Sequence, residues 1–378
     1  MSTGLCLLNL AGAPGSLRIV GDCIVGIDVA PAPGDRLIDC SGTRALPGLI
    51  NAHDHLQLNG LPPLRYRDRY HHADEWIADI HPRLNTDPAL RAYRAAPLAD
   101  RLLTGALKNV LSGATTVAHH DPAYAEMFEP DFPVHVPREL GWSHSLGLDG
   151  ESAVQASHRA TPAHRPWVIH AAEGLEAGEE FERLERLGCI GSNTLLVHGV
   201  GLTTAQQQRL VRAGAGLIWC PASNLAMFDR SVDPAALIEA GALALGSDSR
   251  ISGSADLLVE ARLASRLANL DGAALEQLLT ATAARLLRLP DRGRLAIGMK
   301  ADVILLPAAL PLVRTERASL RAVFREGRLL LADPDLAVQD AGFHGRPATL
   351  DGRAKQLDQT LARAAARSSL PEPGLVIA

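Results

Sequence analysis

Residues 46–56 read LPGLINAHDHL, an apolar run that leads directly into two histidines separated by one residue. The run has the length of a buried strand, and similar runs recur along the chain. Between them lie segments with apolar residues at helical spacing, such as Asp100–Leu111, Glu176–Leu187, Thr204–Ala213 and Ala255–Leu267. The predicted strands are Leu46–Ala52, Thr115–Ala118, Phe132–Val136, Trp167–Ile169, Thr194–Val197, Gly216–Trp219 and Leu243–Leu245. This alternation predicts parallel βα units of the α/β class, arranged as a distorted (β/α)8 TIM barrel.

Shorter strand-like runs flank this region on both sides. They lie within residues 5–29 and again within residues 301–331, and together they predict a small β-sandwich built from both ends of the chain. The tail Ala354–Arg367 has a helical pattern, and Gly150–Arg165 is so short that we expect an abbreviated fourth βα unit. The expected domains are the N-terminal portion of the β-sandwich at 1–47, the barrel at 48–292, the C-terminal portion of the β-sandwich at 293–345 and a helical tail at 346–378.

Composition excludes several classes of protein. The chain has 378 residues, of which 47% are hydrophobic and 21% charged, which is typical of a globular domain. A net charge of −5 speaks against a nucleic-acid partner, and no apolar run approaches the roughly 18 residues of a membrane span. The N-terminus lacks the positive region of a signal peptide. We therefore expect a cytoplasmic protein with a small-molecule substrate and no membrane partner, and the sequence leaves a homodimer open.

The five cysteines do not predict a disulfide framework or a thiolate metal site. They are widely spaced, odd in number and without a CxxC pair: Cys6, Cys23, Cys40, Cys189 and Cys220. We expect buried free thiols.

Polar residues follow almost every predicted strand. In a parallel barrel these positions gather at one face, where active sites lie. His53 and His55 are two residues apart in extended backbone, so their side chains point to the same side. His170 and Asp248 follow later strands and complete a mixed nitrogen and oxygen ligand set. Such a set suits zinc or ferrous iron.

Five later stretches, together with LPGLINAHDHL, carry a resemblance to a known family. They are IHAAEG (169–174), LVHGVGL (196–202), CPASNLAMF (220–228), LGSDS (245–249) and GRLAIGMKADVILL (293–306). These stretches resemble strand ends of the amidohydrolase superfamily, in the branch of metal-dependent deaminases and chlorohydrolases. The first four later stretches match the barrel, and the fifth matches the segment that closes the small β-domain.

The resemblance implies an enzyme that uses one divalent metal, Zn²⁺ first and Fe²⁺ as the alternative. His53, His55, His170 and Asp248 would hold it, and Asp248 would also take a proton from the attacking water. Glu173 would shuttle protons, and His198 would hydrogen-bond the water or the developing oxyanion. We expect hydrolytic deamination of an amino-substituted heterocycle.

Other activities stay open at this point. Within the superfamily they are hydrolysis of a cyclic or linear amide, and loss of chloride or an alkylamine. A non-catalytic metal-binding protein is the alternative from another class. Glu173 and His198 argue against it, because a purely structural site would close the last position of the metal.

Lysine occurs only at Lys108, Lys300 and Lys355. Binuclear members of the superfamily commonly bridge two metals through a carboxylated lysine on the fourth strand, and the lysine-free stretch between Lys108 and Lys300 closes that mode. Glu139, after the third predicted strand, is the alternative second-metal ligand. We expect a mononuclear site.

Substrate contacts are predicted among polar residues near the strand ends. They are Gln57, His119, His120, Arg138, Asn224 and Arg250. The two arginines could pair with a substrate carboxylate or phosphate, or else with a neighbouring acidic residue. The charged stretch Arg65–His72 is a candidate lid or a solvated loop. Asp54, between the two histidines, departs from the family, where threonine is usual.

Overall fold

The parallel strands of the chain lie in two sheets. This computed structural model describes residues 3–378. One sheet has five strands in the order β12-β11-β10-β9-β8, and β6 pairs with β7 in the other. The strands are β6 (Leu49–Asp54), β7 (Ala114–His119), β8 (Gly141–Ser145), β9 (Trp167–Ala171), β10 (Thr194–His198), β11 (Gly216–Trp219) and β12 (Leu243–Leu245). All neighbouring pairs within these two sheets are parallel.

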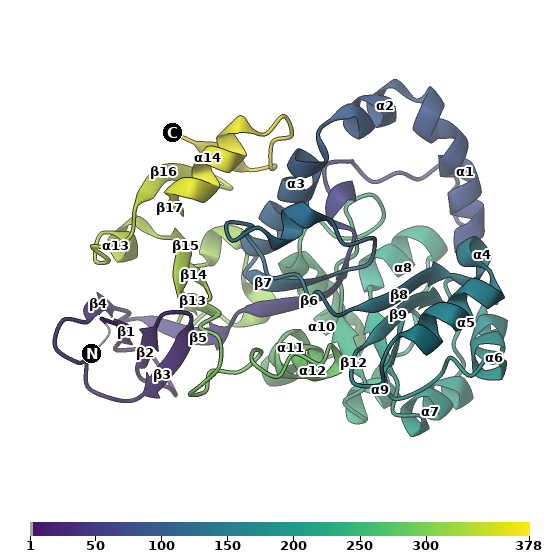
Figure 1. Cartoon of the computed structure of the whole chain (residues 1–378), viewed down its shortest axis with the longest axis horizontal. Helices are drawn as coiled ribbons and strands as arrows, with labels where there is room; N and C mark the ends of the chain where they lie inside the picture. The colour runs from purple at the N-terminus through teal and green to yellow at the C-terminus, as the bar shows by residue number, and fades with distance from the viewer. Residues whose placement is uncertain (1–2) are drawn as a thin grey trace.

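Helices separate these strands along the chain and cover their outer side (Figure 1). They are α1 (Ala73–Thr86), α2 (Pro88–Ala95), α3 (Leu98–Val110), α4 (Leu146–Asp149), α5 (Glu151–Ala160), α6 (Gly178–Arg186), α7 (Thr204–Arg212), α8 (Pro221–Phe228), α9 (Ala235–Glu239), α10 (Leu257–Ala268), α11 (Gly272–Leu279) and α12 (Ala281–Leu286). The helical spacing recognised in the sequence corresponds to α3, α6, α7 and α10.

Strands β9 to β12 are mostly apolar and buried along their whole length, as is usual for parallel sheets, whereas β8 is polar and only half-buried. Side chains alternate between two clusters. Trp167 and Leu217 pack outward against the helices, whereas Val168 and Ile218 belong to an inner cluster. That inner cluster also contains Ile50, so strands of both sheets surround one apolar interior.

Each edge of the β6–β7 pair makes only isolated backbone contacts, with the loop after β12 on one side and with His135, which lies outside both sheets, on the other. The Asp248 amide, just after β12, donates to the His53 carbonyl of β6 at 3.1 Å. On the other side of the pair, Thr116 of β7 forms a single parallel bridge with His135. The predicted α/β class is confirmed, and the parallel strands form two sheets instead of one uninterrupted hydrogen-bonded ring.

The third and fourth units differ from the prediction. Phe132–Val136, predicted as a strand, contributes only the bridge at His135. Pro133 and Pro137 lack amide donors on both sides of that bridge, which prevents a longer ladder. The next strand, β8, begins at Gly141, so the shortened connection lies between the His135 bridge and β8. The stretch Gly150–Arg165, where we expected an abbreviated unit, contains the helix α5.

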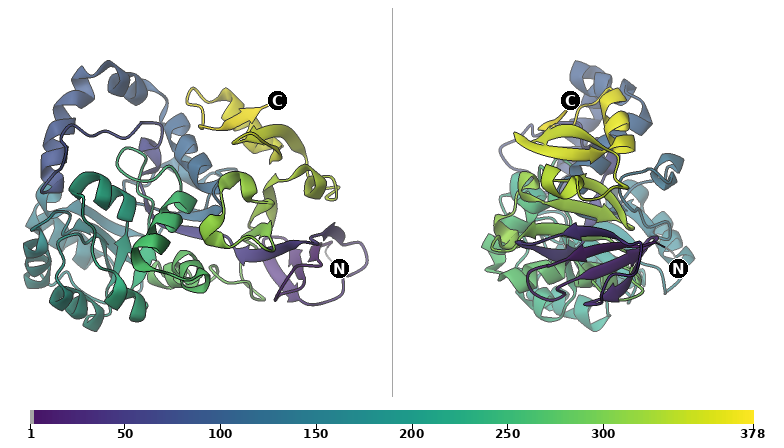
Figure 2. Two further views of the ribbon diagram at one scale, coloured as in Figure 1. Left: turned by 180° about the vertical axis from the view of Figure 1, so that it is seen from behind. Right: turned by 90° about the vertical axis from the view of Figure 1, so that its left-hand side faces the viewer.

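The two ends of the chain form a separate β-region of mostly antiparallel strands (Figures 1 and 2). A four-stranded sheet has the order β3-β2-β1-β4, and a seven-stranded sheet has the order β18-β16-β17-β15-β14-β13-β5. The N-terminal strands are β1 (Leu5–Leu8), β2 (Leu17–Val20), β3 (Cys23–Ile27), β4 (Arg36–Asp39) and β5 (Thr43–Pro47). The C-terminal elements are β13 (Val303–Pro307), β14 (Ala322–Arg325), β15 (Arg328–Ala332), α13 (Pro334–Ala337), β16 (Gly345–Leu350), β17 (Arg353–Asp358), α14 (Gln359–Arg367) and β18 (Leu375–Ile377).

Both ends of the chain meet in this region as expected. Strand β5 pairs with β13, and Leu7 and Ile19 of the first sheet share an apolar core with Leu305 and Phe324 of the second. The segment 346–378, predicted as a helical tail, instead adds strands to the seven-stranded sheet besides α14. The division of the chain at residues 47, 292 and 345 stays a prediction. Among the described residues, no helix has the length and apolar character needed to cross a bilayer.

Glu372 ties the C-terminal segment to the parallel region. Its side chain is fully buried and accepts hydrogen bonds from both guanidinium nitrogens of Arg250, at 2.7 and 2.8 Å, and from Arg317 at 2.6 Å. Arg250 lies in the loop after β12, so this contact holds that loop against the C-terminal segment. Breaking a buried pair from one side leaves uncompensated charge.

Replacing Glu372 by alanine removes the carboxylate partner of the nearly buried Arg250 guanidinium, whereas Arg317 keeps Asp351 at 2.6 Å. We expect the E372A variant to lose about 3–5 kcal/mol of unfolding free energy, measured by chemical denaturation. The control is E316A, because the Glu316 side chain is 71% exposed and lies 4.0 Å from Arg262. That surface pair should contribute about 1 kcal/mol or less. Equal losses in the two variants would contradict the anchoring role of Glu372.

Candidate metal centre

Buried histidines from several strands converge at the carboxyl ends of the parallel strands. The ligand atoms of His53, His55, His120 and His170 all lie within 4.8 Å of one another, and those of His53, His198 and Asp248 form a second such set. Each of these residues lies at or directly after the end of a strand. The structure therefore brings the strand ends together at one face, as the sequence predicts.

The individual distances suit ligands of a single ion. His53 Nε2 lies 3.4 Å from His170 Nε2 and 3.8 Å from Asp248 Oδ1. His55 Nε2 lies 3.9 Å from the same oxygen. Two ligands that are each about 2.1 Å from a metal ion lie at most about 4.2 Å apart. Each of these three pairs is therefore close enough to bind one divalent cation, and His53 belongs to both sets, with His170 in one and Asp248 in the other.

Neighbouring groups orient the imidazoles so that their Nε2 atoms face this space. His55 Nδ1 lies 2.6 Å from Asp121 Oδ2, and His170 Nδ1 lies 2.9 Å from the His144 carbonyl. Such outer partners fix the tautomer and ring orientation of metal-binding histidines. Neither Asp121 nor His144 was among the residues selected from the sequence.

The electrostatics of the cluster also fit a cation. Burial and the neighbouring imidazoles hold the pKa values of His53 and His170 well below the usual value, so both rings are neutral donors. Although burial opposes its charge, His55 and His198 keep the pKa of Asp248 below its ordinary value, so it is a carboxylate. Neutral imidazole and ionised carboxylate are the forms that bind metals. His55 differs, because although burial opposes its charge, Asp121 and Asp248 raise its pKa to about 9, so this ring releases a proton when it binds a cation.

Two positions in the centre have left-handed backbone without being glycine. His198 has a φ of 74° and Asp248 a φ of 52°. Such conformations cost of order 1–3 kcal/mol and persist where the surroundings enforce them, often at functional sites. Asn224 enforces part of this geometry, because its side chain contacts both Nδ1 and the carbonyl oxygen of His198, at 3.0 and 3.3 Å.

Glu173 lies beside the cluster. Its Oε1 is 3.5 Å from His198 Nε2. Burial and the nearby Asp248 charge raise the pKa of Glu173 well above its ordinary value. This shift favours the protonated form of Glu173, which can donate a hydrogen bond or a proton.

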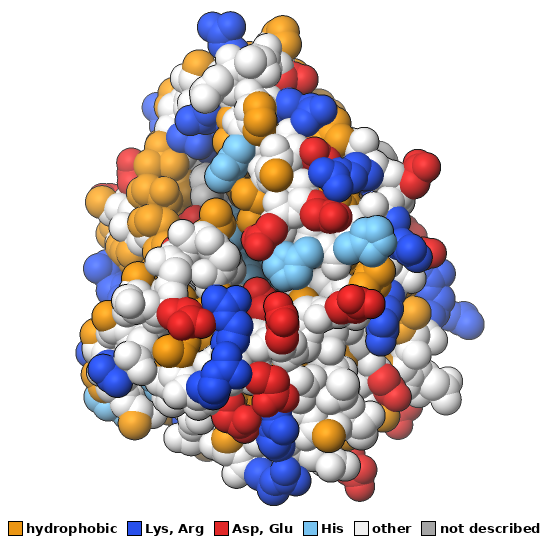
Figure 3. Space-filling view, turned by 90° about the vertical axis from the view of Figure 1, so that its right-hand side faces the viewer, with side chains coloured by type: hydrophobic (Ala, Val, Ile, Leu, Met, Phe, Trp, Pro, Cys, Tyr) orange, Lys and Arg blue, Asp and Glu red, His pale blue; other side chains and the backbone are white. Residues whose placement is uncertain are grey.

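A cavity of about 220 Å³ opens onto the cluster. Its polar floor includes His55, His170, His198, Glu173 and Asp248, with Gln57 beside them. Its opposite wall is apolar and comes mainly from α1, through Trp76, Ile77, Ile80 and Leu84, with Leu58, Leu148, Met227 and Ile251. Figure 3 looks onto the face that carries α1, where histidine and acidic side chains gather near the centre.

Helix α1 is fixed to the site at its start. The Ala73 amide donates to the Glu173 carbonyl at 2.9 Å, and His72 bridges to Gly174. The segment Arg65–His72, for which the sequence left a lid or a solvated loop open, therefore leads into the wall of the cavity.

The residues predicted as substrate contacts are dispersed. Gln57 lines the cavity, and its Nε2 donates to Asp121 at 2.7 Å. His119 and His120 are buried beside the cluster but do not line the cavity. The His120 ring stacks on that of His170 with centroids 4.3 Å apart, and its Nε2 contacts the Ser143 carbonyl. Asn224 holds His198, and Arg250 is bound to Glu372.

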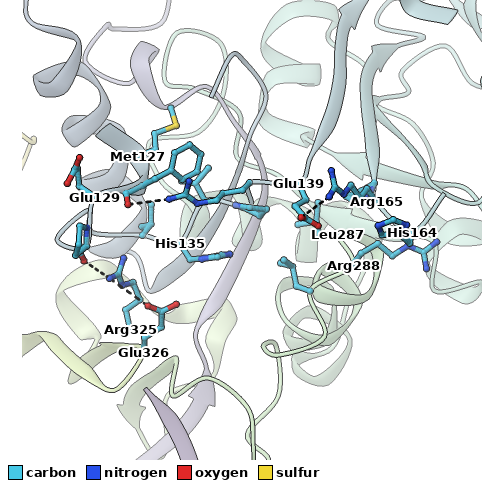
Figure 4. Close-up of a pocket in the computed structure, with 18 residues that line it drawn as sticks. Met127, Glu129, His135, Glu139, His164, Arg165, Leu287, Arg288, Arg325 and Glu326 are labelled. Atoms are coloured by element: carbon cyan, nitrogen blue, oxygen red, sulfur yellow. Dashed lines mark hydrogen bonds and ion pairs between the residues drawn. The ribbon is translucent and has the colours of Figure 1, made fainter. Parts of the chain in front are cut away.

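Arg138 and Glu139 lie in a different cavity of about 540 Å³ (Figure 4). Glu139 pairs with Arg165 at 2.8 Å, and Arg138 lies 3.9 Å over the Phe128 ring. These residues precede β8 and β9, so this cavity is at the amino ends of the strands. The metal cluster is at their carboxyl ends, which leaves Glu139 out of reach as a second metal ligand.

The chain is similar to proteins of a known family of hydrolases. The family model described as "Amidohydrolase family" matches residues 151–330. The chain is 35% identical to an 8-oxoguanine deaminase from Pseudomonas aeruginosa, over 75% of this chain and 78% of that protein. It is 27% identical to a 5-methylthioadenosine/S-adenosylhomocysteine deaminase from Halobacterium salinarum, over 74% and 76% of the two chains.

A solved structure shares the fold. The crystal structure of an adenosine deaminase from Xanthomonas campestris with bound zinc superposes with a TM-score of 0.70 at 19% identity, and covers 89% of this chain and 94% of the other. The chain belongs to the amidohydrolase family, and it is an enzyme that hydrolyses carbon–nitrogen bonds other than peptide bonds.

Proposed function

We propose that this enzyme removes an amino group from a small, uncharged heterocycle by metal-dependent hydrolysis. The observation that carries the proposal is one cavity lined by His55, His170 and Asp248 of the metal cluster and also by Glu173, whose Oε1 lies 3.5 Å from His198 Nε2. Hydrolysis at an sp² carbon needs a nucleophile, a base and an acid, and this floor offers groups for each role.

The proposed cofactor is one divalent ion held by His53, His55, His170 and Asp248, with Zn²⁺ first and Fe²⁺ as the alternative. Three imidazoles and one carboxylate suit either metal. When bound, such an ion lowers the pKa of water towards neutrality and so supplies a nucleophile.

The side chains around the cluster divide the remaining work. Asp248, an ionised carboxylate, is placed to accept the proton of the attacking water. Glu173, whose raised pKa favours the protonated form, is placed to deliver a proton to a ring nitrogen or to the departing amino group. His198 lies between them, and its ring, oriented by Asn224, can hydrogen-bond the developing oxyanion.

The cavity limits the size of the substrate. Its 220 Å³ is below the range of about 300–1,000 Å³ that accommodates drug-sized ligands. The wall formed by Trp76 and the aliphatic residues of α1 suits a flat ring. These features favour a free base over a nucleoside.

The cavity also limits the charge of the substrate. No lysine or arginine is among the residues that line it, whereas Asp121, Glu173 and Asp248 are. Of the two arginines considered from the sequence, Arg250 is bound to Glu372 and Arg138 lies in the other cavity. A carboxylate or phosphate on the substrate would therefore lack a cationic partner. We propose that a neutral small molecule is the only partner that the site itself requires. We also propose that the protein is cytoplasmic.

Removing one predicted ligand should abolish metal binding. In H170A we expect the affinity for Zn²⁺ to fall by more than the about 10–100-fold typical of losing an outer hydrogen-bond partner. Elemental analysis of purified protein and competition with a chelator measure this. The control is H135A, because His135 is a half-buried histidine that lines the other cavity. Retention of metal by H170A would contradict the proposed ligand set.

Replacing Glu173 by glutamine should separate chemistry from metal binding. The amide keeps the shape but cannot deliver a proton, so we expect kcat of E173Q to fall by about 10²–10⁴-fold with metal content unchanged. E176Q alters an exposed carboxylate three residues further along and should keep full activity. Undiminished turnover by E173Q would refute the assignment of Glu173 as the acid.

A panel of substrates tests the proposed reaction and its substrate class. Ammonia release should be found among purine bases, pterins, pyrimidines or aminotriazines. For the best of them, kcat/KM should exceed that of S-adenosylhomocysteine or a nucleoside monophosphate by at least about tenfold, because burying an unpaired charge costs more than about 1.4 kcal/mol. Chloride and alkylamine release are followed in parallel. Preference for an anionic substrate would contradict the charge argument.

A further inference from the structure

A buried lysine lies directly beneath the proposed metal centre. Lys108 is on α3, beside β7, and its side chain is fully buried. The Nζ atom lies 3.1 Å from Asp54 Oδ2 and also donates to the carbonyl oxygen of Asp248. One ammonium group therefore contacts Asp54, which stands between His53 and His55, and also the backbone of Asp248, the proposed carboxylate ligand.

Asp54 turns away from the metal cluster and into a shell of donors. Alternation along β6 places its side chain opposite those of the flanking histidines. Besides Lys108, its carboxylate accepts hydrogen bonds from the side-chain amides of Asn109 at 2.8 Å, Asn59 at 2.9 Å and Asn51 at 3.4 Å. Asp54 is therefore fully partnered and is held on the side of the strand that faces α3.

The same network holds the loop after β12. The Asn51 side chain accepts from the Ser247 amide at 2.9 Å and donates to the Ser247 hydroxyl at 2.8 Å. The Asn59 side chain accepts from the Arg250 amide at 3.1 Å. Asp248 lies between these two anchored residues, in left-handed backbone with a φ of 52°. Its carbonyl oxygen points at Lys108.

We propose that Lys108 is a positioning residue that, through Asp54 and the Asp248 carbonyl, presets the geometry of the metal ligands. This inference rests on the metal-binding part of the proposed function. The ammonium group has two roles that no neutral side chain combines. It balances the buried Asp54 charge, and it donates to a carbonyl that the strained turn directs towards it. Asp54, which departs from the threonine usual in the family, is thus one half of a matched pair.

The chain contains a control for this pair. Lys355, in β17, is also fully buried, and its Nζ contacts one carboxylate, that of Asp333, and one carbonyl oxygen, that of Leu320. It lies in the β-region, among the C-terminal strands. K108M and K355M therefore both remove a buried ammonium group that contacts one carboxylate and one carbonyl oxygen, although Asp333 is also paired with Arg321 and is partly exposed.

The test measures Zn²⁺ affinity by chelator competition, the visible spectrum of the Co²⁺-loaded protein, and thermal stability of the metal-free protein. We expect K108M and K355M both to lower the melting temperature. Only K108M should weaken Zn²⁺ binding, by about 10–100-fold, and change the Co²⁺ spectrum. Equal Zn²⁺ affinity in the two variants would show that Lys108 serves stability alone.

A double variant separates charge balance from positioning and covers the case in which K108M does not fold. In D54N/K108M both charges are absent, so stability should recover towards the wild type. The Asp248 carbonyl still lacks the charged Lys108 donor and keeps only the Ser247 hydroxyl at 3.0 Å, so Zn²⁺ affinity should remain reduced by at least about tenfold. Wild-type affinity in this double variant would overturn the positioning role. Failure of the wild-type protein to bind Zn²⁺ tightly would instead overturn the proposed function together with this inference.

Discussion

The convergence of buried imidazoles and a carboxylate on one point is the constraint around which the carboxyl end of the strands is organised. Polar groups taken out of water must find partners, and charges must find opposite charges. The Nε2 atoms of His53, His55 and His170 face this point, whereas Asp248 also accepts hydrogen bonds from the Ser249 amide and the Ser252 hydroxyl. The outward nitrogens of His55 and His170 are bound by Asp121 and the His144 carbonyl, and such outer partners are typical of histidines that bind a cation.

The outer regions of the molecule hold the residues of the metal cluster in position. The loop after β12 is held from three sides: by the His53 carbonyl, by the Asn51 and Asn59 side chains, and through Arg250 by the buried Glu372. The C-terminal segment therefore belongs to the support of the site, although it lies far from it in sequence. Helix α1 closes the opposite side, and its first amide is bound to the Glu173 carbonyl. A change in either support would reach the cluster through two or three hydrogen bonds.

The sequence was informative wherever a residue's position along a strand determined its place in space. Strand ends of a parallel array meet at one face, so residues as far apart in sequence as His53 and Asp248 could be grouped from the sequence. Glu173 and His198 were found by the same reasoning and by the family resemblance. The signal failed where proline interrupted a run, as at Phe132–Val136, and where a strand is polar, as in β8 with the sequence GWSHS. His144, whose carbonyl orients His170, belongs to that polar strand.

By itself, the sequence determined the α/β class, the contribution of both chain ends to a β-region and the identity of the residues that could bind a metal. These features depend on local periodicity and on the order of strand ends, which are written in the chain. Only the tertiary structure decided what each polar side chain contacts. Arg250 could have met a substrate but is paired with Glu372, Asn224 holds His198, and Lys108 lies beneath the site although it is on a helix. Such pairings depend on which elements pack together over long separations in sequence, and burial then makes each one energetically decisive.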